Sequence, residues 1–114
     1  MMAKEIWTSR HRYARISPYK IRLVTQLIAG RHVNEALELL KFTKKRGCAY
    51  VDKVLRAAMA DADEQEADVR NLFVREARVD EGPKIKRFKP KDRGRAHSIF
   101  KRTSHIVVSV AERA

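Results

Sequence analysis

Four histidines and one acidic stretch are the features of this chain whose residue types could support catalysis or metal binding. The histidines are His11, His32, His97 and His105. They lack the H-E-x-x-H spacing that brings two imidazoles to one metal, and in residues 61–68 Glu66 stands where a calcium loop needs glycine for its sharp turn. A nuclease that uses His97 or His105 as general acid and base is an alternative, but it requires a cleft, and their segment has the composition of a protruding arm. We therefore expect no catalytic residue, no metal site and no cofactor.

Positive charge is the dominant chemical feature. The 114 residues include 26 Lys and Arg against 14 Asp and Glu, a net charge of +12 at pH 7. Residues 83–105 hold nine Lys or Arg and one acid, Asp92, so about a fifth of the chain carries eight of the twelve net charges. Like charges at this density repel one another unless a partner neutralises them. The composition therefore predicts a polyanionic partner, and nucleic acid above all.

Four groups of residues are candidates for RNA contact, because guanidinium planes stack on bases and pair with phosphate while Lys neutralises backbone charge. The basic arm contributes Lys84, Lys86, Arg87, Lys89, Lys91, Arg93 and Arg95. The segment after it, residues 101–106, is predicted to be one continuous strand whose two faces both offer donors, and it contributes Lys101, Arg102, Thr103, Ser104 and His105. Nearer the N-terminus are Arg10, Arg12, Arg15, Ser17, Lys20 and Arg22, followed by Lys44, Lys45 and Arg46. The alternative is a solvated charged face or, for the arm, a disordered basic tail.

Two helices are predicted in the first half of the chain. A short strand at residues 4–10, with Trp7 and Ser9 on one face, and an exposed basic connector at residues 10–15 precede them. The first helix has Ser17 as its N-cap, Pro18 at its first position and Gly30 at its end. Its apolar stripe consists of Ile21, Val24, Leu27 and Ile28. The second helix covers residues 33–42 and turns inward Ala36, Leu37 and Leu40.

A third helix and two strands complete the predicted body. The helix covers residues 44–63, and its apolar positions are Cys48, Val51, Val54, Leu55, Ala58 and Ala62. From Leu72 the apolar residues recur every second position, which is typical of a strand. Leu72 and Val74 lie on one face, but Ala77 and Val79 fall on the other, and this change of face predicts a bulge near Arg75 and Glu76. A second strand alternates through Ile106, Val108 and Val110.

These elements predict an α+β fold, with three helices packed on a small antiparallel sheet and a long protruding β-hairpin. We expect one domain over residues 1–114, with the extended basic hairpin at about residues 82–101. Pro90 and the pair Arg93-Gly94 predict a turn near the middle of the hairpin. Two strands of about ten residues would reach roughly 30 Å from the body. Cys48 is the only cysteine. Because one cysteine cannot form a disulfide within the chain, a reducing compartment is favoured. No apolar run approaches the roughly 18 residues of a membrane span. The expected location is therefore cytoplasmic.

Two other classes of function are alternatives for a basic chain of this size. A free nucleic-acid regulator would need a recognition helix, whereas most of the positive charge lies on a predicted hairpin. A small hydrolase would need a catalytic constellation, which the sequence lacks. A structural RNA-binding protein that is not an enzyme is the favoured interpretation.

Several motifs resemble the bacterial family of ribosomal large-subunit protein twenty-two, over about residues 10–110. The first helix, SPYKIRLV at residues 17–24, and the second, with Glu35, Ala36 and Leu37, are similar to the family's first two helices. More specific are VDEGP at residues 79–83, Lys86-Arg87, Pro90, GRA at residues 94–96 and KRTSHI at residues 101–106. Lys91 and Asp92 stand where the family usually has Arg and Ala, and Asp61 lies where asparagine is common.

The resemblance implies a structural constituent of the large ribosomal subunit that binds several domains of its ribosomal RNA and aids assembly. It further implies that the hairpin tip lines the nascent-peptide exit tunnel, opposite the extension of ribosomal large-subunit protein four. By residue match the tip consists of Lys86, Arg87, Phe88, Lys89, Pro90, Lys91, Asp92, Arg93 and Gly94. The implied partners are ribosomal RNA, neighbouring ribosomal proteins and the nascent polypeptide, with no membrane and no homo-oligomer.

Overall fold

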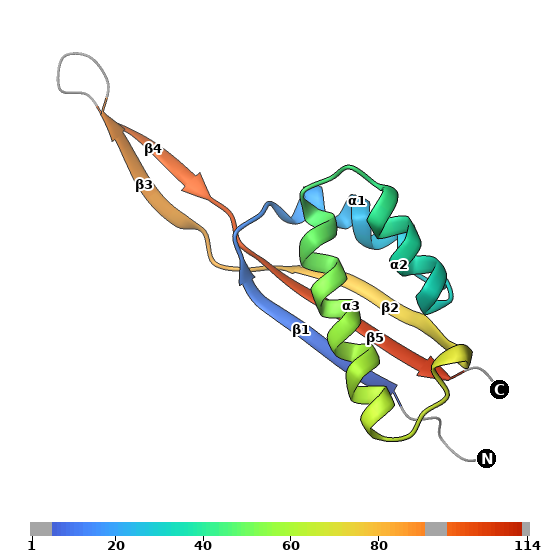
Figure 1. Cartoon of the computed structure of the whole chain (residues 1–114). Helices are drawn as coiled ribbons and strands as arrows, with labels where there is room; N and C mark the ends of the chain where they lie inside the picture. Colours follow the sequence, from blue (N-terminus) through green and yellow to red (C-terminus); the bar gives the residue numbers. More distant parts are fainter. Residues whose placement is uncertain (1–5, 91–95, 113–114) are drawn as a thin grey trace.

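The fold is a helical layer on one face of a three-stranded sheet, with a separate two-stranded hairpin projecting from one end (Figure 1). The computed structural model describes residues 6–90 and 96–112, and their side chains except those of residues 85–100. The elements are β1 (Ile6–Ala14), α1 (Pro18–Ile28), α2 (Val33–Phe42), α3 (Gly47–Glu64), the 3-10 turn η1 (Val69–Asn71), β2 (Leu72–Glu81), β3 (Ile85–Pro90), β4 (Ala96–Lys101) and β5 (Ser104–Glu112). The predicted fold class is confirmed.

Strand β5 is the centre of the sheet, because it pairs antiparallel with β1 on one side and β2 on the other. Ile106, Val108 and Val110 belong to the core shared with the helices, as their alternation predicts. The residues between them, Val107 and Ser109, are also buried but lie outside this core, so burial itself does not alternate along the strand. The register of β2 against β5 shifts between Val74 and Glu76. The predicted bulge is therefore confirmed at its predicted place.

The helices bury the faces that their apolar spacing predicts. All six predicted apolar positions of α3 are buried, as are Ala36 and Leu40 of α2. Helix α3 begins against α1 at a position where only glycine fits without adjustment, because a Cβ on Gly47 would lie 3.1 Å from Ile21 Cδ1 and 3.3 Å from Val24 Cγ2. This close approach fixes the loop before α3 beside the start of α1.

The predicted connector at residues 10–15 is wrong, because β1 continues to Ala14. Arg10 pairs with Val107 and His11 with Ile106, so the backbone here belongs to the sheet although the side chains show no apolar periodicity. The register then shifts between His11 and Ala14, and Tyr13 lies in the left-handed region with φ 59°. Such a backbone is costly for a residue with a Cβ. Strand β1 therefore ends in a strained bulge.

Three details at the helix ends also differ from the predictions. Ser17 occupies the N-cap position of α1, but its hydroxyl makes no capping hydrogen bond. Leu27 is 37% exposed, and Thr25 takes its place on the buried side of α1. Helix α3 begins at Gly47 instead of residue 44, so the cations Lys44 and Lys45 lie in the loop before the helix.

The hairpin of β3 and β4 is a two-stranded sheet of its own, with pairs running from Ile85 with Lys101 to Pro90 with Ala96. It gives the molecule a long axis of 67 Å, against 29 and 21 Å across. The predicted turn at Arg93 and Gly94 lies outside the described residues. One predicted feature is wrong: the chain does not alternate as a single strand from residue 101 to 106, because β4 ends at Lys101 and β5 begins at Ser104. No described helix is long and apolar enough to cross a membrane.

Candidate nucleic-acid interface

The hairpin leaves the sheet through a root that hydrogen bonds hold together. The Gly82 N–H donates to the Thr103 carbonyl at 3.0 Å, and the Thr103 hydroxyl donates to the Pro83 carbonyl at 2.7 Å. A Cβ on Gly82 would lie only 2.4 Å from Thr103 Oγ1 and 3.3 Å from the His105 ring. The root therefore needs glycine at this position to bring its two strands together.

A buried hydroxyl connects the root to the start of α1. Ser104 is fully buried, and its Oγ donates to the Ile16 carbonyl at 2.6 Å. Thr103 is also buried, at 4% exposure. The two hydroxyls that were predicted to contact RNA are thus bonded inside the protein, and we leave them out of the candidate surface. Ser104 places the segment before α1 beside the hairpin root, and Thr103 joins the two strands of the root.

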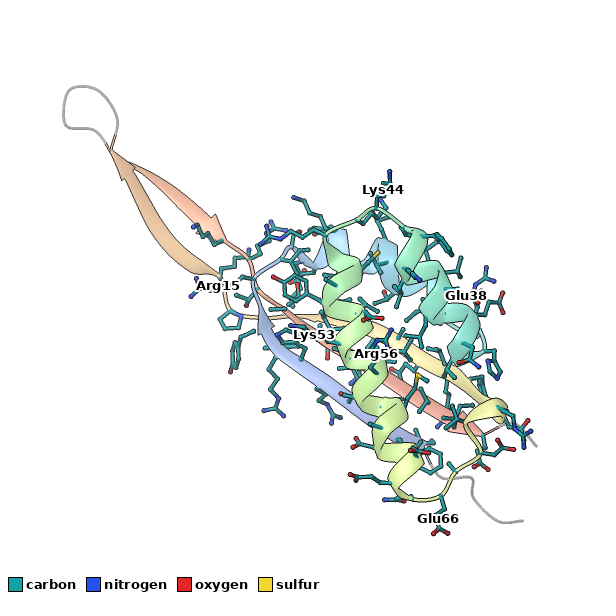
Figure 2. All side chains as sticks on the ribbon, viewed as in Figure 1. Arg15, Glu38, Lys44, Lys53, Arg56 and Glu66 are labelled. Carbon is teal, nitrogen blue, oxygen red and sulfur yellow. The ribbon has the colours of Figure 1, made fainter. Side chains whose placement is uncertain are left out.

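Five cations from three parts of the chain surround one hollow at this junction. The hollow, which we call the root pocket, has a volume of about 450 Å³ and is lined by Arg15, Ile16, Ser17, Lys20, Arg46, Lys101, Arg102 and Thr103. Arg15 comes from the segment between β1 and α1, Lys20 from the first turn of α1, and Arg46 from the loop before α3. Lys101 and Arg102 come from the hairpin root. In Figure 2 Arg15 lies where the hairpin meets the body. Three of the four predicted groups of residues therefore contribute to one site.

The basic surface continues around the start of α3. A second pocket of about 290 Å³ is lined by Lys20, Lys45 and Arg46 together with Ile16, Leu23 and Gly47. The ion pairs of the described residues involve other arginines, namely Arg31, Arg56, Arg70 and Arg78. The cations of the two pockets are thus unpaired within the described part of the chain, an arrangement that favours a polyanionic ligand.

An aromatic ring lies among these cations. Tyr19 is 59% exposed, and the Cζ atoms of Arg102 and Arg22 lie 5.3 and 5.8 Å from its ring centroid. Both are cation–π distances. Arg22 also donates to the Val79 carbonyl at 3.2 Å, so part of its guanidinium binds the sheet. Sequence reasoning did not single out Tyr19, although an aromatic residue inside a basic motif is a signal for nucleic-acid binding.

His105 is engaged within the protein. Its Nδ1 accepts a 3.0 Å hydrogen bond from the Tyr13 N–H, and the two rings meet edge to face with centroids 4.8 Å apart. This contact accompanies the left-handed backbone of Tyr13. Among the described residues no group of three or more His, Cys, Asp or Glu could hold a metal ion. The arrangement of cations around the root pocket suits electrostatic binding of a polyanion.

Comparison with known protein families matches residues 9–111 to ribosomal protein L22p/L17e. The chain belongs to this family. It is therefore a large-subunit ribosomal protein that binds ribosomal RNA, has a structural and not an enzymatic role, and is located in the ribosome with other ribosomal proteins. The expected bacterial membership stays a prediction.

The remaining predicted contacts of this ribosomal protein do not line the root pocket. Arg10 and Arg12 are exposed on β1, and Lys84 is exposed just before β3. Lys44 is at the tip of the loop between α2 and α3 (Figure 2). Strand β3 contains Lys86, Arg87, Phe88, Lys89 and Pro90. The described residues do not include Lys91, Asp92, Arg93, Gly94 and Arg95.

Acidic side chains gather at the opposite end of this ribosomal protein. Asp61, Asp63, Glu64 and Glu66 are exposed at the end of α3. Figure 2 shows Glu66 at the end of the body away from the hairpin, whereas Arg15 lies beside the hairpin. This separation of charge orients the root pocket and the hairpin toward a polyanion and turns the acidic end away from it.

Proposed function

We propose that the root pocket and the cations around it anchor the body of this protein on large-subunit ribosomal RNA. The observation that carries the proposal is the convergence of five cations, unpaired among the described residues, at the point where the hairpin leaves the sheet. The proposed contacts of the body are Arg10, Arg12, Arg15, Ser17, Lys20, Arg22, Lys44, Lys45, Arg46, Lys84, Lys101 and Arg102.

The hairpin extends this contact into the RNA. Its cations Lys86, Arg87, Lys89, Lys91, Arg93 and Arg95 neutralise phosphates of several RNA domains and thereby aid assembly of the subunit. Its tip, residues 86–94, lines the nascent-peptide exit tunnel and contacts the nascent polypeptide. The family resemblance supports this part of the proposal. So does the hairpin itself, because β3 and β4 pair only with each other and project beyond the helices (Figure 1).

Reconstitution of large subunits tests the role of the body. A triple variant, Lys20→Glu, Arg46→Glu and Lys101→Glu, should enter purified large subunits poorly and should bind ribosomal RNA with a weaker salt dependence than the unmodified protein. A charge-reversal control, Lys53→Glu with Arg56→Glu, lies on the exposed side of α3 (Figure 2) and should enter normally. Equal incorporation of both variants would contradict the proposed anchor.

Crosslinking tests the tunnel contact. A photo-reactive residue in place of Phe88 should crosslink to a nascent chain held on stalled ribosomes, whereas the same group at Lys53 should not. Crosslinks from neither position would contradict the tunnel contact and leave the RNA anchor standing.

A further inference from the structure

The root pocket has the shape and the polar groups of a site for a single nucleotide. We propose that it holds one unpaired nucleotide of RNA, extruded from its stack, with the phosphate among the cations and the base against the guanidinium of Arg102. The inference rests on the proposed anchoring of the body on RNA, and it names the RNA structure that the anchor recognises.

Shape is the first argument. The pocket's volume of about 450 Å³ lies within the roughly 300–1,000 Å³ typical of small-ligand sites. Its cations come from α1, the loop before α3 and the hairpin root, so they surround a hollow instead of forming a flat stripe. The bases of a paired A-form helix are stacked inside and its phosphates follow a convex surface. A duplex would touch only the rim of this pocket, whereas an extruded nucleotide can enter it.

The second argument is an unused hydroxyl. Ser17 lines the root pocket, is half-buried and makes no capping hydrogen bond to α1. No other partner for its Oγ is found among the described residues. A hydroxyl can both donate and accept, as a ribose 2′-hydroxyl does. Ser17 is therefore placed to distinguish ribose from deoxyribose.

The third argument is a guanidinium held in place. The Tyr19 ring centroid lies 5.3 Å from Arg102 Cζ, and this contact restricts the Arg102 side chain at the wall of the pocket. A planar guanidinium offers a stacking surface to a base as well as donors to phosphate. Tyr19 is a positioning residue in this arrangement, and Phe could replace it because the cation–π contact needs only the ring face.

Fluorescence anisotropy with the full chain tests the proposal. The probes are short RNA hairpins with the same stem, either fully paired or carrying one bulged nucleotide, with each of the four bases tried at the bulge. We expect at least one bulged RNA to bind about tenfold more tightly than the paired RNA, because a stacked base contributes that order of affinity. A 2′-deoxy substitution at the bulged nucleotide should lower the affinity for the bulged RNA several-fold.

Variants assign the preference to the pocket. Arg102→Ala and Tyr19→Ala should remove the preference for the bulge, Tyr19→Phe should retain it, and Ser17→Ala should remove only the discrimination against 2′-deoxy. Lys53→Ala, which removes one exposed cation that does not line the pocket, should retain both effects. Circular dichroism of each variant controls for folding.

The outcomes separate the two proposals. Equal affinity for bulged and paired RNA, with a steep salt dependence, would overturn the nucleotide site while the RNA anchor stands. A bulge preference that persists in Arg102→Ala would also overturn it, because the base would then bind elsewhere. Failure to bind any RNA would overturn both the site and the anchor.

Discussion

The Thr103 hydroxyl donates a 2.7 Å hydrogen bond to the Pro83 carbonyl, across the root of the hairpin and twenty residues away in the chain. Thr103 is almost fully buried, and its own carbonyl accepts from the Gly82 N–H. Both strands of the root are therefore joined through one residue. This contact fixes the direction in which the hairpin leaves the sheet.

Replacing Thr103 by Val keeps the shape of the side chain and removes the donor. The Pro83 carbonyl then loses its partner, and we expect a loss of about 1 kcal/mol in the free energy of unfolding. Amide exchange at Gly82 should become faster, because the root opens more often. Thr103→Ser retains the hydroxyl and is the control. Unchanged exchange at Gly82 in Thr103→Val would show that the bond does not hold the root.

Removing the Ser104 hydroxyl should lower the free energy of unfolding more than Thr103→Val does. Ser104→Ala leaves the Ile16 carbonyl without its 2.6 Å donor in a fully buried setting, at a cost of about 1–3 kcal/mol. Ser109→Ala is the matched control, because its partner, the Thr8 hydroxyl, is only partly buried and can bond water instead. Urea unfolding measures both variants. A larger loss in Ser109→Ala would contradict the role assigned to Ser104.

A stabilising substitution is expected at the end of α3. Glu66 lies in the left-handed region with φ 61°, and the N–H groups of Glu66 and Ala67 donate to the carbonyls of Asp63 and Ala62. This is a Schellman motif, in which glycine is the preferred residue. Glu66→Gly should raise the free energy of unfolding by about 1 kcal/mol. Gln65→Gly, at a residue with φ −93°, should bring no gain, and a thermal melt compares the two.

The salt dependence of RNA binding should report individual phosphate contacts. Lys20 lines both pockets of the basic surface, so Lys20→Ala should weaken binding and reduce the slope of log affinity against log salt by about 1. Lys53→Ala should leave the slope unchanged. Equal slopes for the two variants would mean that Lys20 makes no phosphate contact.

The elements that local spacing determines could be predicted from the sequence. The apolar positions of α2 and α3 repeat every three or four residues, and the change of phase in β2 marks its bulge directly. The end of β1 could not be predicted in this way, because Arg10 belongs to the sheet only through its pairing with Val107. That contact joins residues almost a hundred positions apart and leaves no periodic pattern in the chain.

The sequence predicts which basic segments form the candidate site, but it does not predict how the fold arranges them in space. Charge identified the segments that contain Arg15, Arg46 and Arg102, yet only the fold brings them around one pocket. The sequence predicts RNA contact for the hydroxyls of Thr103 and Ser104, because they follow the basic arm on a segment expected to be one strand. The break between β4 and β5 turns both side chains into the protein.

The hairpin is joined to the body through β2 and β5, and β5 is hydrogen-bonded to a neighbouring strand along both edges. Tension applied to the arm is therefore transmitted first to the middle of the sheet. Separating that strand would require two ladders to open together, which corresponds to unfolding of the whole body. If RNA holds the arm as proposed, a pull on it would load the central strand β5 together with the edge strand β2.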